Sequence, residues 1–216
     1  MIKYIRLHLN RIFLICGLAM AASEIWKQLC LTFIVNSGHY YWWYFPFQLC
    51  SIPMYICLIL PWTTSVRLRK VLLTFLMDFG LLGGIFTFFD TSGLHYPYPP
   101  LTVHSFAWHI LLILLGLTAG LAVEGGCTWR DYGRCTALYG GACIIATILN
   151  MLFYRFGAIN MFYISPHYYM TQVIFKDIAA SLGNTAGIFV YIAAILAGAA
   201  VFHMLWRLAR RHMNIQ

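Results

Sequence analysis

Long apolar runs occupy most of the chain, and short polar or basic segments separate each run from the next. A helix needs about 20 mostly apolar residues to cross the hydrocarbon core of a bilayer. Runs near that length predict six membrane-spanning helices, at residues 11–35, 43–62, 70–89, 101–123, 135–155 and 184–206. The first run has the weakest pattern, because Glu24 and Lys27 interrupt it. The pattern therefore predicts an all-α polytopic membrane protein, with residues 1–216 forming one six-helix transmembrane domain.

The basic residues indicate how these helices are oriented. They gather before the first run and after the second, fourth and sixth: Lys3, Arg6, Arg11, Arg67, Arg69, Lys70, Arg130, Arg134, Arg207, Arg210 and Arg211. With six spans these segments lie on one side of the membrane, and Lys176 is the clear exception on the other side. Lys and Arg are concentrated in cytoplasmic loops, so both termini are predicted to be cytoplasmic.

Two segments on the opposite side differ from simple loops. Residues 90–100 are rich in Pro and Tyr, a composition that disfavours one continuous helix. Residues 156–183 are too many for a simple connection and include an amphipathic part, 168–182. We expect a short amphipathic or re-entrant helix there, between the fifth and sixth spans, lying on or dipping into the outer face.

The composition supports the membrane interpretation. Hydrophobic residues make up 62% of the chain and charged residues 9%, whereas a soluble domain has roughly 25% charged residues. A net charge of +8 would suggest a nucleic-acid partner for a soluble protein, but the concentration of Lys and Arg on one side of the membrane explains it here. We therefore expect a multi-pass protein of the cell membrane, with membrane lipids and no nucleic acid as partners.

The cysteines do not indicate a metal site or a disulfide framework. The seven are scattered, and no pair has the spacing of zinc ligands: Cys16, Cys30, Cys50, Cys57, Cys127, Cys135 and Cys143. An odd number also argues against complete pairing, and most of these thiols are expected to be small buried hydrophobes. The chain has no Walker A, GxGxxG or HExxH motif, so no metal or cofactor is predicted.

The second run contains the strongest candidate for chemistry. Pro46 and Pro53 enclose a small polar island that includes Gln48 and Cys50. A proline within a membrane helix removes a backbone hydrogen bond and opens the helix locally. A thiol beside such a break is better exposed than one on a regular helix face, so Cys50 is the candidate reactive group.

Polar residues of other runs fall at a similar depth. Ionisable groups within a bilayer are costly, so each is a functional candidate by default. Counted from the outer ends at about 1.5 Å per residue, several of them share a layer roughly 10 Å below the outer surface. The layer contains Cys50, His109, Lys27 and Asn150, with Glu24 and Asp78 beneath it.

A Cys and a His at one depth suggest a nucleophile and its base. A His that takes the thiol proton produces the reactive thiolate. Lys27 would then stabilise that anion, and Gln48 or Asn150 would donate a hydrogen bond to an oxyanion.

Each of these residues also has a structural interpretation. A single Cys in a membrane helix is usually a small packing residue, and a His in a helix often forms a hydrogen bond with a neighbouring carbonyl. Glu24 and Lys27, spaced i and i+3, are expected to neutralise each other. Asp78 precedes several glycines that let helices approach closely, so it also fits a packing contact.

Several short motifs, taken in order, resemble those of a known family. They are Glu24 in the first span, PFQLC ending at Cys50, DFGLLGG from Asp78, SFAWHILLILLGL around His109, and the Asn-aromatic element NMFY from Asn160. In these the chain resembles the YwaF-like integral membrane family, whose eukaryotic branch is transmembrane protein 164. The resemblance covers nearly the whole chain, although the family often has His at the position of Gln48.

This resemblance implies a six-helix fold similar to that of the androgen-induced intramembrane hydrolases, which use a Thr nucleophile and a His. In the eukaryotic branch the Cys is implicated in acyl transfer to lysophospholipids through a thioester. The resemblance thus implies Cys50 as nucleophile and His109 as base, within a supporting set of polar residues that includes Asn160.

The leading functional hypothesis is an intramembrane acyltransferase or lipid hydrolase acting on acyl lipids. Cys50 would attack an acyl ester, and His109 would take the thiol proton and return it to the leaving alcohol. The alternative is a small transporter or ligand-binding membrane protein, with a polar path lined by Glu24, Lys27, Asp78 and His109 and with the Pro-broken second span as its moving part. A purely structural subunit is a third hypothesis, for which the buried charges would be an unexplained cost.

Overall fold

The computed structural model describes residues 2–122, 125–126 and 128–212, with side chains from residue 8 onward. This part of the chain is helical, without strands, and its α-helices are α1 (Ile2–Leu29), α2 (Ile52–Ile59), α3 (Val66–Phe75), α4 (Leu81–Phe86), α5 (Pro99–Leu121), α6 (Trp129–Phe153), α7 (Phe175–Leu182) and α8 (Asn184–His212). The all-α prediction is confirmed for these residues. The predicted end of the fourth span at residue 123 lies outside them.

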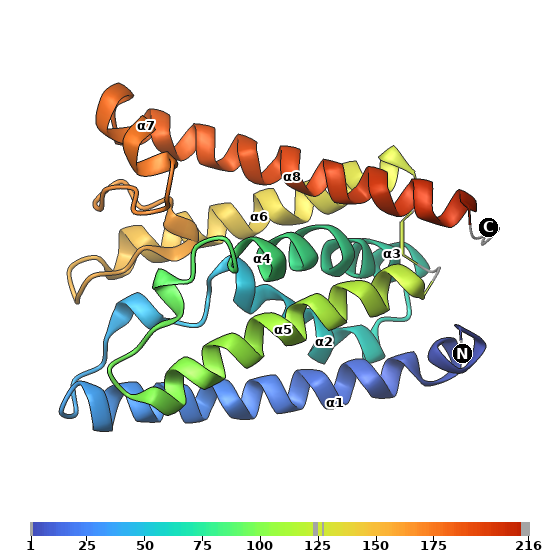
Figure 1. Cartoon of the computed structure of the whole chain (residues 1–216), viewed down its shortest axis with the longest axis horizontal. Helices are drawn as coiled ribbons and strands as arrows, with labels where there is room; N and C mark the ends of the chain where they lie inside the picture. Colours follow the sequence, from blue (N-terminus) through green and yellow to red (C-terminus); the bar gives the residue numbers. More distant parts are fainter. Residues whose placement is uncertain (1, 123–124, 127, 213–216) are drawn as a thin grey trace.

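The long helices run along the longest axis of the molecule. Figure 1 shows α1, α5, α6 and α8 extended in this direction, with α2, α3 and α4 among them and both chain ends at the same end of the bundle. Four stretches are long and apolar enough to cross a membrane: His8–Val35, Pro99–Leu121, Trp129–Phe153 and Asn184–His212. They match the predicted first, fourth, fifth and sixth spans, with ends that differ by several residues.

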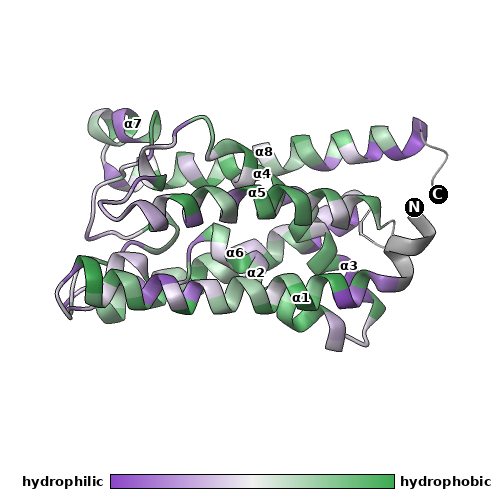
Figure 2. Cartoon of the chain, turned by 60° about the horizontal axis from the view of Figure 1, so that its bottom comes forward, coloured by the Kyte–Doolittle hydropathy of each residue, from purple (hydrophilic) through white to green (hydrophobic). Residues whose placement is uncertain are grey.

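The hydropathy of the residues also changes along this axis. Figure 2 shows hydrophobic residues over most of the helical surface and hydrophilic residues toward the C-terminal end of α8 and the start of α3. Arg67, Arg69 and Lys70 lie in the first turns of α3, and Arg210 and Arg211 in the last turn of α8. The basic residues thus gather at one end of the bundle.

The predicted second span is shorter than expected. Its helical part runs only over Leu49–Trp62, with 3-10 turns at Leu49–Ser51 and Leu60–Trp62 on either side of α2. The residue before a proline is disfavoured in helical geometry, and Phe45, before Pro46, is extended with φ −53° and ψ 133°. The backbone N–H of Gln48 instead donates to the Ser51 hydroxyl at 3.4 Å, so the helix begins after Gln48.

The predicted third span forms one continuous helical stretch with an irregular centre. A π-helical turn, Leu76–Gly80, joins α3 to α4 and contains the buried Asp78. π-Turns within α-helices are rare and occur frequently at functional sites. Asp78 therefore lies where the regular hydrogen-bond ladder of this helix is interrupted.

Glycines let this stretch pack closely against α5. A Cβ placed on Gly84 would lie 2.9 Å from Cγ1 of Ile113, and one on Gly116 would lie 2.8 Å from Cβ of Leu81. A Cβ on Gly83 would meet nothing within 4 Å. The close packing expected of the DFGLLGG segment is therefore present at Gly84, and it holds α4 directly against the turn of α5 that carries His109.

A short helix precedes the last long one, as the sequence predicted. It is α7, which begins at Phe175, later than the predicted 168. Ile174, with φ 74°, precedes the helix, and Gly183, with φ 93°, follows its last residue, Leu182. A Cβ on Gly187 of α8 would lie 2.5 Å from Cβ of Ala179, so α7 packs tightly on α8. Residues 168–174 connect to it as turns and coil.

Candidate functional site

Cys50 lies in the 3-10 turn that opens the α2 stretch. Its thiol is free and its side chain is half-buried. The indole Nε1 of Trp108, on α5, donates a hydrogen bond to the carbonyl oxygen of Cys50 at 3.0 Å. The turn that carries the candidate nucleophile is therefore held by the residue that immediately precedes His109.

One ring nitrogen of His109 forms a hydrogen bond within α5, and the other is available as an acceptor. Its buried imidazole places Nδ1 2.8 Å from the carbonyl oxygen of Ser105. A carbonyl oxygen only accepts, so Nδ1 carries the proton and Nε2 of the neutral ring is a proton acceptor. Among the described residues no hydrogen bond joins the Cys50 thiol to His109, so the proton transfer between them stays a prediction.

Glu24 and Lys27 form the ion pair expected from their spacing. Lys27 Nζ lies 2.7 Å from the Glu24 carboxylate. Gln28 donates to the same carboxylate at 2.7 Å and to the carbonyl oxygen of Tyr44 at 2.6 Å. The two opposite charges therefore largely neutralise each other.

A second histidine, His104, belongs to the same region, and the sequence did not single it out. Its ring lies 5.6 Å from that of Trp26 on α1 and 5.6 Å from that of Trp108, measured between centroids. Its Nε2 is buried and has no hydrogen-bond partner among the described residues. The i, i+4 spacing of His104 and Trp108 on one helix was the available signal, because it places both on one face of α5.

Aromatic residues of two loops meet near this region: Tyr44 precedes α2 and Tyr96 precedes α5. The rings of Tyr96 and Tyr44 lie 5.4 Å apart between centroids, and both pack against the small core formed by Cys30, Leu31 and Leu101. Burial raises the pKa of the Tyr96 hydroxyl, so this side chain stays neutral over the physiological range.

Gln48 and Asn160 come together although 112 residues separate them in the chain. The side-chain amide of Gln48 donates to the carbonyl oxygen of Asn160 at 2.9 Å and accepts from the backbone N–H of Phe162 at 2.8 Å. Gln48 therefore pairs with the backbone of residues 160–162 much as a neighbouring strand would. A family member with His at this position would have a different set of donors and acceptors.

Asn150 holds the same segment from α6. Its amide donates to the carbonyl oxygen of Met161 at 3.1 Å and accepts from the Met161 N–H at 2.7 Å. Phe162 and Tyr163 follow with φ values of 58° and 57°, a left-handed conformation that is uncommon for bulky residues. The two side-chain amides thus stabilise a strained buried turn beside the polar island of Cys50.

Asn160 itself has an unused donor. Its buried side-chain oxygen accepts from the N–H of Ser165 at 2.9 Å, but its Nδ2 is buried and no residue that the structure describes pairs with it. Leaving a buried donor unpaired costs about 1–3 kcal/mol. Gln48 and Asn150, the two predicted oxyanion donors, already use their amides on the backbone of residues 160–162, whereas the NH2 group of Asn160 has no partner among the described residues.

Asp78 belongs to a separate cluster. Its carboxylate lies 2.8 Å from Nδ1 of His203 on α8, and both side chains are fully buried. Nε2 of His203 lies 3.1 Å from the carbonyl oxygen of Thr128. His203 was missed by the sequence reasoning, although a single His in the apolar run 184–206 was a visible signal.

Arg210 extends this second cluster about two helical turns beyond His203 on α8. Its guanidinium donates to the carbonyl oxygens of Gly120, at 2.6 and 3.2 Å, and of Gly125, at 3.0 Å. Trp206, on the same helix, donates from Nε1 to the carbonyl oxygen of Met77 at 3.2 Å. These contacts tie α8 to the end of α5 and to the π-turn that contains Asp78.

Within the described residues, no group of three or more potential ligands is arranged to hold a metal ion. The described cysteines are free thiols: Cys16, Cys30, Cys50, Cys57, Cys135 and Cys143. Cys127 lies outside the described residues.

These features define a class: a helical, multi-pass membrane protein whose apolar spans enclose buried polar clusters. A family model described as the TMEM164 family matches residues 2–206, and the chain belongs to this family. No match was found among curated proteins or solved structures. The similarity in fold to the androgen-induced intramembrane hydrolases stays a prediction.

Proposed function

We propose that the protein transfers acyl groups of membrane lipids through a thioester on Cys50, with a lysolipid or water as acceptor. The observation that carries this proposal is the hydrogen bond from Trp108 to the Cys50 carbonyl. It ties the thiol-bearing turn to α5 one residue before His109, whose Nε2 is left as an acceptor. Membership of the TMEM164 family supports the same assignment.

The first half-reaction consumes an acyl ester. His109 Nε2 takes the thiol proton, and the Cys50 sulfur attacks the ester carbonyl carbon. A carbon–sulfur bond forms, the carbon–oxygen bond to the glycerol breaks, and the leaving alkoxide recovers the proton from His109. The products are a lysolipid and an acyl-Cys50 thioester.

The second half-reaction regenerates the thiol. The hydroxyl of the acceptor gives its proton to His109 Nε2 while its oxygen attacks the thioester carbonyl carbon. The new carbon–oxygen bond forms, the carbon–sulfur bond breaks, and the sulfur takes the proton back. A lysolipid as acceptor makes the protein an acyltransferase, and water makes it a hydrolase.

In each half-reaction a negative charge develops on the carbonyl oxygen of the acyl group, and a hydrogen-bond donor is needed to stabilise it. Asn160 is the best candidate, because its Nδ2 is buried without a partner and Gln48 links its backbone to the turn before Cys50. Gln48 and Asn150 instead position the segment that carries Asn160. Lys27 contributes less than a lone cation would, since Glu24 pairs with it at 2.7 Å.

The direct test is to trap the thioester. Purified protein incubated with an alkyne-tagged acyl phospholipid should acquire a tag that hydroxylamine removes. The tag should be lost in Cys50→Ala, because the thiol that would bond to the acyl carbon is gone. Cys143→Ala is the matched control, since Cys143 is also a half-buried free thiol.

Labelling of Cys50→Ala at the wild-type level would exclude Cys50 as the nucleophile. Equal loss in Cys143→Ala would show that the tag reports damage to the fold. A tag that resists hydroxylamine would mean that the bond formed is not a thioester.

We also propose six membrane crossings, with the α2 stretch and the α3–α4 stretch completing the four long spans, both termini cytoplasmic, and α7 on the outer face of the cell membrane. The gathering of basic residues at one end supports this orientation. Cysteines introduced at Arg67 and Arg130 should react with an impermeant maleimide only from the cytoplasm, and a cysteine at Ser92 only from outside. Reaction of all three from one side would mean that a crossing has been miscounted.

A transporter is the second candidate, because the Asp78–His203 pair lies at a π-turn between two helices. Such a buried ionisable pair fits a proton path. The Cys50 variant separates the two functions: a transporter reconstituted in vesicles would retain its flux in Cys50→Ala, whereas the thiol enzyme would lose its activity.

A further inference from the structure

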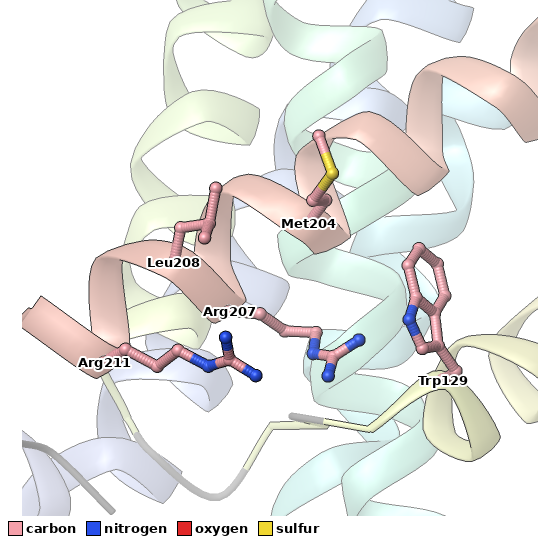
Figure 3. A pocket seen from close by; sticks show the side chains of 5 residues that line it. All are labelled: Trp129, Met204, Arg207, Leu208 and Arg211. Atoms are coloured by element: carbon pink, nitrogen blue, oxygen red, sulfur yellow. The ribbon is translucent and has the colours of Figure 1, made fainter.

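A pocket opens at the basic end of the bundle, far along α8 from α7. It has a volume of about 230 Å³ and is lined by Trp129, Met204, Arg207, Leu208 and Arg211. Figure 3 shows the Arg207 and Arg211 guanidinium groups extending from α8 on the side that faces Trp129. Trp129 is the first residue of α6, so the pocket lies between the end of one long helix and the start of another.

No carboxylate of the described residues neutralises the charge in this pocket. Arg207 and Arg211 are spaced i and i+4, so they lie on one face of α8. Arg207 lies over the Trp129 ring at 5.3 Å from its centroid. Neither arginine forms an ion pair with any carboxylate in the described part of the chain. Asp131, two residues beyond Trp129, is engaged by the Thr128 hydroxyl at 2.7 Å and by Arg134 at 3.6 Å.

The adjacent Arg210 has a structural role and differs in its contacts from the two pocket arginines. It is buried, and its guanidinium donates to the carbonyl oxygens of Gly120 and Gly125. Arg207 and Arg211 make no such contact with the backbone that the structure describes, and they extend into the pocket (Figure 3). The three neighbouring arginines therefore divide into one that stabilises the fold and two that face a ligand site.

The rest of the pocket wall is apolar. Met204, Leu208 and Trp129 are 44%, 44% and 51% exposed. Two guanidinium groups favour a phosphate, to which arginine donates paired hydrogen bonds. The exposed apolar side chains beside them suit the glycerol and the upper acyl chains, and tryptophan is typical of the headgroup level.

We infer that this pocket binds an anionic phospholipid from the leaflet that surrounds the basic end of the bundle. The lipid phosphate lies between Arg207 and Arg211, and its chains follow Met204 and Leu208 along α8. Basic pockets between membrane helices bind anionic headgroups in this way. The Trp129 ring lies 5.5 Å from that of His203, between centroids, so the bound lipid also packs beside the Asp78–His203 cluster.

The test compares two variants of equal charge. Arg207→Gln/Arg211→Gln removes both pocket arginines, and Arg67→Gln/Arg130→Gln removes two exposed arginines from the same end of the bundle. Binding of phosphatidylglycerol and of phosphatidylcholine to each full-length protein in detergent is measured by native mass spectrometry. We expect the pocket variant to bind phosphatidylglycerol about 30-fold more weakly than wild type, as two basic residues beside an anionic headgroup usually contribute.

The control variant should keep wild-type affinity, and phosphatidylcholine should bind all three proteins equally. Inorganic phosphate should leave the thermal unfolding temperature of the wild type unchanged, because it cannot use the apolar wall, whereas phosphatidylglycerol should raise it. Equal weakening in both variants would show that only surface charge matters, and unchanged binding in the pocket variant would exclude the site. An equal stabilisation by inorganic phosphate would show that the ligand is the free anion and not a lipid.

Discussion

The variant His109→Gln is expected to lower the rate of acyl transfer by about 10²- to 10⁴-fold, the usual contribution of a general base. Gln retains an amide N–H that can still bond the Ser105 carbonyl, so the local fold is preserved. It cannot accept and return a proton, because the amide has no basic nitrogen. Turnover of a tagged phospholipid in reconstituted vesicles, measured beside the melting temperature, separates loss of chemistry from loss of fold.

His104→Gln is the matched control, because His104 lies on the same helix near the same tryptophan and has its own buried, unpartnered Nε2. It should keep most of the wild-type rate. The reverse pattern, with His104 essential and His109 dispensable, would assign the base to His104 and require a different geometry at Cys50. Full activity in both variants would exclude both of these α5 histidines as the base.

His203→Leu is expected to destabilise the protein by about 3–5 kcal/mol, the cost of leaving one partner of a buried ion pair uncompensated. Asp78 would lose the contact at 2.8 Å, and its other carboxylate oxygen is already buried with no partner in the described part of the chain. The measurement is equilibrium unfolding in mixed detergent, followed by tryptophan fluorescence.

The double variant Asp78→Leu/His203→Leu provides the control for that prediction. Replacing both partners by apolar side chains is often neutral or stabilising, so the double variant should recover most of the stability lost in His203→Leu. A double variant as unstable as the single one would mean that steric misfit, and not an unpaired charge, causes the loss.

The sequence predicted the spans far better than the contacts between them. Apolar length alone located the four long helices, because crossing a bilayer imposes that length. The start of the α2 stretch was missed, since the hydropathy of residues 43–48 resembles that of a helix while Pro46 and the Gln48–Ser51 hydrogen bond prevent one. Local hydrogen bonding overrode the apolar pattern.

The polar clusters show a different limit of prediction. Counting depth placed Cys50, His109 and Lys27 in one layer, which stays a prediction; the Trp108 hydrogen bond shows only that the Cys50 turn contacts α5 beside His109. Depth does not determine helix rotation, because lipid-facing and core-facing residues are equally apolar. The Asp78–His203 pair depends on that rotation, and the pairing of Gln48 with residues 160–162 depends on a loop that folds back.

The shortness of the helical stretch Leu49–Trp62 also has a consequence for where a lipid must go. Twelve residues separate Trp62 from Cys50, or about 18 Å at 1.5 Å per residue. If Trp62, which is 75% exposed, marks one boundary of a core about 30 Å thick, the thiol lies about 12 Å inside the other boundary. Lipid ester carbonyls rest at the boundary itself. For the ester to reach the sulfur, either the bilayer must therefore thin around the protein or the lipid must move deeper into the membrane. The reaction rate should then depend on the thickness of the host membrane.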